Sequence, residues 1–234
     1  MDDNLLRGCL VRLSAEDPEP LAAGLSRWWR DSEFFRLLSF HASPMFSPKH
    51  VREWLEKELE KNPPEFYLFG IRSLDDDKLI GFMDLGRPSQ SGNCWVGIGL
   101  GERDYWGKGY GTDAMQAALR FAFMELNLQR VTLNVFDYNA RGVRSYEKAG
   151  FEVEGRVREA ILRDGVRHDV IFMGVLRENW LQGTAQSSLR HLRSTAGRLA
   201  LAQHPRGAAG SRPERGAGAG GRQGISEPEG PVLS

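Results

Sequence analysis

Apolar residues recur at three- and four-residue steps in three segments near the start of the chain, and this spacing is typical of amphipathic helices. The first helix is predicted after Asp17–Pro20 and carries apolar residues up to Trp29. The second is predicted from Asp31 to Phe40, and the third from Ser47 to the Asn62–Pro64 stop. A short strand from Cys9 to Leu13 is expected to precede them.

The period of the pattern then changes from helix-like to strand-like. Phe66–Arg72 and Lys78–Leu85 are separated by an acidic turn, which predicts a hairpin. The elements predicted after that hairpin are a strand Asn93–Leu100, a helix Asp113–Asn127, a strand Arg130–Phe136, a helix Asn139–Ala149 and two closing strands, Phe151–Arg156 and His168–Leu176. This order predicts a mixed α+β fold around a mostly antiparallel sheet, because a repeated βαβ pattern is missing from it.

Composition divides the chain near residue 182. Aromatic residues reach Trp180 and then stop, and residues 183–234 hold ten of the 27 glycines. We therefore expect one folded domain over 1–182 and a Gly/Pro/Arg-rich tail over 183–234, whose composition is typical of disordered segments. The tail carries seven arginines and three acidic residues, which leaves 24 basic and 28 acidic residues in the domain. That balance weakly favours a cationic partner such as an amine over nucleic acid.

Cysteines, histidines and hydropathy set further expectations. Cys9 and Cys94 form no CxxC pair, which is consistent with a reducing cytoplasm. The chain starts with an acidic stretch and has no run of 18 apolar residues, so neither a signal peptide nor a membrane span is predicted. The five histidines show no metal-ligand spacing, so no metal site is predicted.

The candidate chemistry centres on a glycine loop. In Trp106–Thr112, glycines at alternate positions allow close backbone approach to a ligand, and the following helix directs its free N–H groups and positive dipole end at the loop. This construction binds anions, most often phosphate. A Walker A loop is excluded, because Gly109 follows Lys108 where Ser or Thr is needed and position 102 is Glu. A dinucleotide fingerprint is disfavoured by the antiparallel strands that precede the loop.

Two motifs resemble those of the GNAT acetyltransferase superfamily. Trp106–Gly111 is similar to the family's R/Q-x-x-G-x-G/A motif, with Trp106 at the position usually held by Arg or Gln. Asn139–Phe151 (NARGVRSYEKAGF) is similar to a later segment of the family. The residues resemble most the branch with ribosomal-protein N-terminal acetyltransferases, over roughly residues 8–180. The resemblance implies a six- to seven-stranded sheet that is splayed between strands 4 and 5 and flanked by helices.

The resemblance also implies acetyl-CoA as the acetyl donor and an amine as the acceptor. The cofactor-binding residues that it implies are Ile98, Gly99 and Leu100 on the fourth strand, Trp106, Gly107, Lys108, Gly109, Tyr110, Gly111 and Thr112 in the loop, and Asn139. Tyr146 matches the family's general-acid tyrosine. It lies seven residues after Asn139 and therefore about 10 Å farther along the same helix face. Packing beneath the closing hairpin is the alternative for Tyr146, a plain N-cap for Asn139 and exposure to solvent for Lys108.

The general base is not fixed by the motifs. Asp84 is the first candidate because it lies at a strand end beside the glycine-bearing strand, and Glu102 and Asp31 are the others. Cys94 is not expected to carry an acyl group, since no nearby His is placed to lower its pKa. We expect direct attack in a ternary complex by a protein N-terminal amine, a polyamine or another small amine such as an aminoglycoside, in a monomer or homodimer without nucleic-acid or membrane partners. The alternative is a non-catalytic acyl-CoA-binding or regulatory module.

Overall fold

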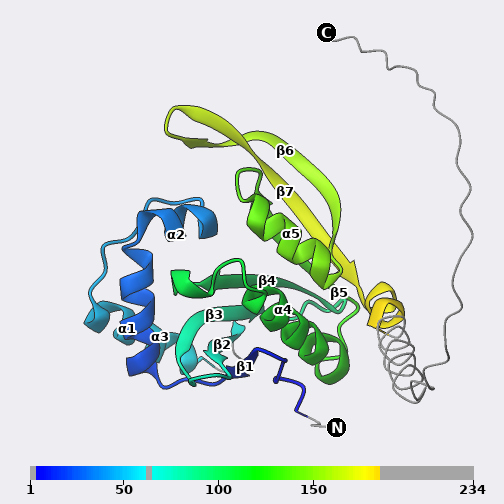
Figure 1. Cartoon of the computed structure of the whole chain (residues 1–234), viewed down its shortest axis with the longest axis horizontal. Coiled ribbons are helices and arrows are strands. Elements are labelled where there is room, and N and C mark those ends of the chain that lie inside the picture. The colour runs from blue at the N-terminus through cyan, green and yellow to red at the C-terminus, as the bar shows by residue number, and fades with distance from the viewer. Residues whose placement is uncertain (1–3, 62–64, 185–234) are drawn as a thin grey trace, which may run out of the picture. The chain divides into compact units, whose positions relative to one another are not determined.

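The structure, a computed structural model, describes residues 4–61 and 65–184. Seven strands and the helices around them make up this part of the chain (Figure 1). The strands are β1 (Val11–Ser14), β2 (Phe66–Ser73), β3 (Leu79–Gly86), β4 (Asn93–Leu100), β5 (Arg130–Phe136), β6 (Glu152–Arg163) and β7 (Val166–Leu176). The α-helices are α1 (Pro18–Trp29), α2 (Ser32–Leu38), α3 (Pro48–Leu59), α4 (Tyr110–Arg120) and α5 (Ala140–Ala149), and residues 177–184 are also helical.

The predicted tail lies outside the described residues except for Gly183 and Thr184, so the domain boundary stays a prediction. No helix in the described ranges is long and apolar enough to span a membrane.

All seven strands belong to one sheet in the order β1-β2-β3-β4-β5-β7-β6. Neighbouring strands are antiparallel except β4 and β5, which run parallel. Those two strands pair only through Asn93–Trp95 with Arg130–Thr132. Beyond Trp95 the pairing ends while both strands continue, so the sheet splits into a β1–β4 half and a β5–β7–β6 half. The splayed, mostly antiparallel α+β sheet implied by the sequence is confirmed.

Side chains at the helix ends explain where several helices begin. The Asp31 side chain accepts from the backbone N–H groups of Glu33 and Phe34 at the start of α2, and Ser47 accepts from His50 at the start of α3. Short polar N-cap residues satisfy the donors that the first helical turn leaves free. Helices α2 and α3 therefore begin where the polar residues of the sequence predicted.

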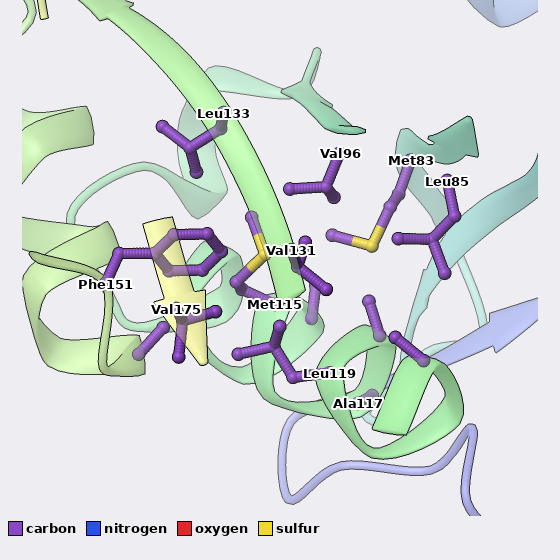
Figure 2. Packing of buried hydrophobic residues seen from close by; sticks show 14 of the residues in the cluster. Met83, Leu85, Val96, Met115, Ala117, Leu119, Val131, Leu133, Phe151 and Val175 are labelled. Atoms are coloured by element: carbon purple, nitrogen blue, oxygen red, sulfur yellow. The ribbon is translucent and has the colours of Figure 1, made fainter. Parts of the chain in front are cut away.

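The larger core lies between α4 and the sheet (Figure 2). Met115 and Leu119 of α4 pack there against apolar side chains of β3, β4, β5 and β7, among them Met83, Val96, Leu133 and Val175. A second cluster joins α1 and α3 to Phe82. Successive residues of a strand point to opposite faces, and Met83 is in the first cluster while Phe82 is in the second. The helices α1 and α3 therefore cover the face opposite to α4.

Three expectations about elements were wrong. Helix α4 begins at Tyr110 and not at Asp113, because Gly109 adopts a left-handed φ of 94° that turns the chain directly into the helix. Its α-helical part ends at Arg120, and Phe121–Glu125 continues it as a π-helix, so the helical run ends two residues before the expected Asn127. The strands of the last hairpin are longer than expected, because β6 continues to Arg163 and β7 begins at Val166. The turn between them lies at Asp164 and Gly165, as predicted, and both residues have positive φ.

The predicted apolar face of α3 is only partly buried. Val51 and Leu55 are fully buried, whereas Trp54 and Leu59 are 38% and 50% exposed. The buried stripe is therefore narrower than the apolar stripe of the sequence.

Candidate active site

A pocket of about 250 Å³ lies at the split between β4 and β5. Four segments meet around it: α2, the end of β4, the glycine loop with the start of α4, and α5. The lining residues are Phe34, Leu37, Leu38, Ile98, Gly99, Leu100, Tyr105, Trp106, Gly107, Gly109, Gly111, Thr112, Asn139, Arg141, Gly142, Arg144, Ser145, Tyr146 and Lys148. The pocket therefore brings together the two predicted motifs and the predicted part of β4.

The glycine loop presents bare backbone to the pocket. Gly107 and Gly109 have φ values of 73° and 94°, which side-chain-bearing residues rarely adopt, and a Cβ at Gly107 would meet nothing within 4 Å. Helix α4 begins directly after Gly109, so its unpaired first-turn N–H groups lie beside this opening. The loop has the open backbone and the helix N-terminus that an anion site requires.

Two of the predicted loop residues do not line the pocket. The Lys108 side chain is exposed to solvent, and Tyr110 is buried with its hydroxyl 3.2 Å from Asp75 Oδ2. The Tyr110 ring also makes an edge contact with Tyr105, with ring centroids 4.9 Å apart. The Tyr110 side chain therefore packs outside the pocket, where its contacts hold the start of α4 in place.

Trp106 links three parts of the site. Its indole N–H donates to the Leu100 carbonyl at 2.7 Å, which ties the loop to the end of β4. The Arg141 guanidinium lies 3.9 Å from the centroid of its ring, and that of Arg103 lies 5.3 Å away. Burial lowers the pKa of Arg141 from its usual value. Where the family usually has Arg or Gln, this chain has an aromatic ring that carries an arginine from α5.

Helix α5 supplies a polar wall. The Asn139 side chain caps the helix by accepting from Gly142 N at 2.9 Å, and the Ser145 hydroxyl lies 2.8 Å from the Thr112 hydroxyl. Arg141, Arg144 and Lys148 add three cationic side chains to the lining. These three residues were not predicted from the sequence, although their spacing of three and four residues along a predicted helix was a signal for one common face.

Tyr146 lies on the same helix and also lines the pocket. The residue is half-buried, and its ring makes an edge contact with Phe151, with ring centroids 6.2 Å apart. Burial raises the pKa of Tyr146 to about 12, so the phenol is protonated at neutral pH. No side chain or backbone group of the described ranges makes a hydrogen bond with its hydroxyl. The Tyr146 ring therefore packs against Phe151, while its hydroxyl has no hydrogen-bond partner in the described residues.

The candidate carboxylates differ in their surroundings. Asp31 binds Arg103 at 2.7 Å and caps α2, and its hydrogen bonds to Arg103 lower its pKa. Glu102 accepts from Trp28 Nε1 at 2.9 Å and pairs with Lys78 at 2.9 Å. Burial opposes ionisation of Glu102, but these partners prevail and its pKa is lowered. Both groups are therefore held ionised by cationic partners.

Asp84 is the exception among these carboxylates. It lies on β3 beside Gly97 of β4, outside the pocket lining, and burial raises its pKa to about 6. Burial and the charge of Asp84 also raise the pKa of Cys94 to about 12, so this thiol is protonated at neutral pH. Of the three carboxylates, Asp84 has the pKa closest to that of a base working near neutrality.

The glycines of β4 make room for side chains on the face that α1 and α3 cover. A Cβ at Gly97 would lie 2.5 Å from Asp84 Oδ1, and one at Gly99 would lie 2.8 Å from both Phe34 and Phe82. A Cβ at Gly101, directly after the end of β4, would lie 2.1 Å from the Trp28 ring. The close packing of these side chains is therefore a steric reason for glycine at each of the three positions.

The split sheet, the glycine loop at a helix N-terminus and the phenol in the pocket define a coenzyme A-dependent acyltransferase class of site. Residues 7–152 match the family described as the acetyltransferase (GNAT) domain. The chain belongs to this family and is an acetyl-CoA-dependent N-acetyltransferase. In the described residues, no cluster of three His, Cys, Asp or Glu side chains is placed to hold a metal ion.

Relatives agree with this assignment. The chain is 32% identical over 137 residues to the SPbeta prophage-derived uncharacterized N-acetyltransferase YokL of Bacillus subtilis, covering 57% of this chain and 73% of that one. It is 29% identical over 129 residues to the ribosomal protein uS5-alanine N-acetyltransferase of Escherichia coli, covering 54% and 65%. The crystal structure of a spermidine N-acetyltransferase from Vibrio cholerae with CoA and spermine shares the fold, with a TM-score of 0.65, 23% identity and coverage of 73% and 98%.

Proposed function

We propose that the protein transfers the acetyl group of acetyl-CoA to a primary amine by direct attack within a ternary complex. The observation that carries this proposal is the single pocket lining that combines the anion-binding loop, the end of β4 and the Tyr146 phenol. The pocket also reaches α2, on the other face of the sheet, through Phe34, Leu37 and Leu38. Donor and acceptor therefore have access to one split from two sides.

The loop is proposed to hold the pyrophosphate of the donor. The backbone N–H groups from Gly107 to Thr112 supply most of the contacts, and Asn139 holds the donor near the start of α5. Arg141 adds the positive charge that Trp106 does not carry, because the ring of Trp106 keeps that guanidinium at the pocket. Ile98, Gly99 and Leu100 offer an unpaired strand edge to the amide groups of the donor arm.

Two protons leave the amine nitrogen during the reaction. Asp84 takes the first from the ammonium, which makes the nitrogen nucleophilic, and passes it to solvent. The nitrogen attacks the thioester carbonyl carbon, the C–S bond breaks, and the nitrogen loses its second proton. Tyr146 protonates the leaving thiolate and regains that second proton. The products are an amide, free coenzyme A and one proton released to solvent.

The acceptor is proposed to be a protein N-terminal amine first, then a polyamine or an aminoglycoside. The E. coli relative is named for an alanine of a ribosomal protein and the V. cholerae structure for spermidine, so amines of both kinds occur among similar proteins. The alternative of a non-catalytic binding module is set aside, because the family match and the N-acetyltransferase relatives identify an enzyme. We propose a cytoplasmic location for this reaction.

An acetyl-transfer screen tests the proposal. The purified chain is mixed with acetyl-CoA and, separately, with ribosomal N-terminal peptides, polyamines and aminoglycosides, and free thiol is measured. We expect thiol release that depends on the amine, with equal amounts of acetylated product by mass spectrometry. Binding of acetyl-CoA without amine-dependent thiol release from any member of the panel would refute transfer by this site.

A further inference from the structure

Four side chains flank the split on the sheet face that Phe82 shares with α1 and α3. Asp84 and Trp95 lie on the β3–β4 side, and their common face follows from the pairing of Asp84 with Gly97, two residues after Trp95. Asn134 lies on the β5 side and pairs with Phe172 of β7. Trp95 is the last residue of β4 to pair with β5, opposite Thr132. Two residues farther along each strand, Gly97 of β4 and Asn134 of β5 therefore lie at the same level on either side of the split. Asp84 lies beside Gly97.

Three of these four residues, Trp95, Asp84 and Asn134, have unused binding capacity. Trp95 is 51% exposed although it is a tryptophan in the middle of a sheet, and its ring makes an edge contact with Phe172 at 6.2 Å. Asp84 and Asn134 are half-buried, and neither side chain makes a hydrogen bond or ion pair with another described residue. Buried or half-buried polar groups are usually paired, so this pair of open polar groups indicates a ligand site.

We propose that this face is the acceptor subsite and that it takes a primary amine with one positive charge and an apolar or aromatic group next to it. The ammonium lies between the Asp84 carboxylate and the Asn134 amide oxygen, and the apolar group lies against Trp95 and Phe172. This inference rests on the proposed function, because the amine nitrogen reaches the thioester through the split.

The carboxylates around the split argue for a single positive charge. Asp31 and Glu33 bind Arg103, and Glu102 binds Lys78 and Arg27. A polyamine needs further anionic partners for its second and third ammonium groups, spaced along its chain. Since those neighbouring carboxylates are already paired with cations, Asp84 offers one charge and the site is matched to a monocation.

The spacing of the residues fits a short amine. Trp95 and Gly97 are two residues apart on one face of β4, which places the Trp95 side chain about 7 Å from the position beneath Asp84. An aromatic ring two carbons from an ammonium spans a similar length. Contact with aromatic faces favours both the ring and the cation of such a molecule.

Three probe amines test this subsite: 2-phenylethylamine, butylamine and spermidine. Binding of each to the protein with excess coenzyme A is measured by ligand-observed NMR, and acetylation of each is measured separately. For the unmodified chain we expect 2-phenylethylamine to bind about tenfold more tightly than spermidine, because one favourable ring contact is worth about that factor. The variant Trp95→Ala is expected to lose that factor for 2-phenylethylamine and to change butylamine binding less than about twofold.

Two further variants sharpen the result. Trp54→Ala is the matched control, because Trp54 is an exposed tryptophan of α3 that is not one of the four residues of the subsite; we expect no change in any probe. Asn134→Asp places a second carboxylate beside Asp84, so we expect spermidine to gain relative to 2-phenylethylamine. Tighter binding of spermidine to the unmodified chain, or a preference that ignores Trp95, would overturn the inference. Trp95-dependent binding without acetylation of any probe would instead refute the transfer function and leave the subsite in place.

Discussion

Tyr146 is the residue that we propose as the general acid of the reaction. Its phenol lines the pocket, has no hydrogen-bond partner in the described ranges and has a pKa of about 12. We expect Tyr146→Phe to lower kcat about 100-fold, because a positioned general acid contributes a factor of that order. The KM for acetyl-CoA is expected to change little, since the ring remains in place.

Steady-state thiol release at pH 7 and pH 9 measures this effect. The loss is expected to be equal at both values, because the phenol is protonated at both. Tyr67→Phe is the control: Tyr67 is a half-buried tyrosine of the core that packs against Phe121 and does not line the pocket. If Tyr146→Phe turned over like the unmodified chain at both pH values, Tyr146 would not be the acid.

Arg141 is expected to act on donor binding and not on the chemical step. Replacing Arg141 by Ala removes the cation that Trp106 holds at the pocket, so we expect the Kd for coenzyme A to rise about tenfold, as for the loss of one charged contact. Calorimetric titration at low and high salt measures it, with Arg52→Ala on α3 as control. An affinity that Arg141→Ala leaves unchanged would show that backbone groups alone hold the phosphates.

Asp84 links the pH dependence of stability to that of activity. Below about pH 4 this carboxyl is protonated in both the folded and the unfolded chain, so it has no effect on their balance. Between about pH 4 and pH 6 the unfolded chain loses this proton while the folded chain keeps it, because the folded-state pKa is about 6. Above about pH 6 the folded chain must bury the charged carboxylate. The contribution of Asp84 to the free energy of unfolding therefore falls between pH 4 and pH 7, by at most about 3 kcal/mol.

Urea denaturation of the Asp84→Asn variant tests this sign. We expect the variant to gain stability relative to the unmodified chain as the pH is raised from 4 to 7. The unmodified chain is also expected to lose kcat/KM on the acid side with a midpoint near pH 6, and the variant to be about 100-fold slower above it. A stability difference that is constant across this range would contradict the raised pKa.

Among the elements, α4 shows how one aspartate side chain connects a helix of the candidate site to a neighbouring strand. Asp113 lies in its first turn, and its carboxylate accepts from the backbone N–H groups of Cys9, Leu10 and Val11 at 3.0, 2.8 and 3.0 Å. The start of β1 is thereby tied to the helix whose N-terminus faces the pocket.

We expect Asp113→Asn to lower the free energy of unfolding by about 2 kcal/mol, because an amide cannot accept all three N–H groups and leaves part-buried donors unpaired. Thermal and urea unfolding measure the change. Asp17→Asn is the matched control, since Asp17 is also an aspartate at the start of a helix but its side chain makes no capping bond. Equal losses for the two variants would mean that the three hydrogen bonds add nothing specific.

Elements with a strong local signal were predicted well, and those fixed by distant contacts were not. Strands β4 and β5 and the ends of α5 follow from alternation, the Asn139 cap and the Gly150 stop, all of which are local. The length of β6 was missed because its residues are mostly exposed and its strand form depends on pairing with β7. Likewise, the motif indicated Asn139 and the loop, whereas the stacking of Arg141 on Trp106 joins residues 35 positions apart and has no local signature.

At the scale of the whole molecule, the two halves of the sheet are joined by few contacts around the pocket. The pairing of β4 with β5 spans three residue pairs. On one face, the Thr112–Ser145 contact and a 3.1 Å hydrogen bond from Gln116 Nε2 to the Ala149 carbonyl connect α4 to α5. On the other face, Arg36 of α2 binds Asp164 at the tip of the last hairpin at 2.7 Å. Side-chain contacts therefore connect the two halves on both faces of the sheet.

A ligand that occupies the split should reduce local opening of the β4 edge that is not paired with β5. We expect coenzyme A to slow hydrogen exchange in peptides covering residues 96–101 and 109–113 at labelling times of seconds to minutes, because local opening dominates exchange there. Peptides from β2 should not change at these times, since β2 is paired on both sides with β1 and β3. Equal slowing in all peptides would indicate only global stabilisation by mass action. Slowing confined to other segments, with binding verified by calorimetry, would place the donor outside the split.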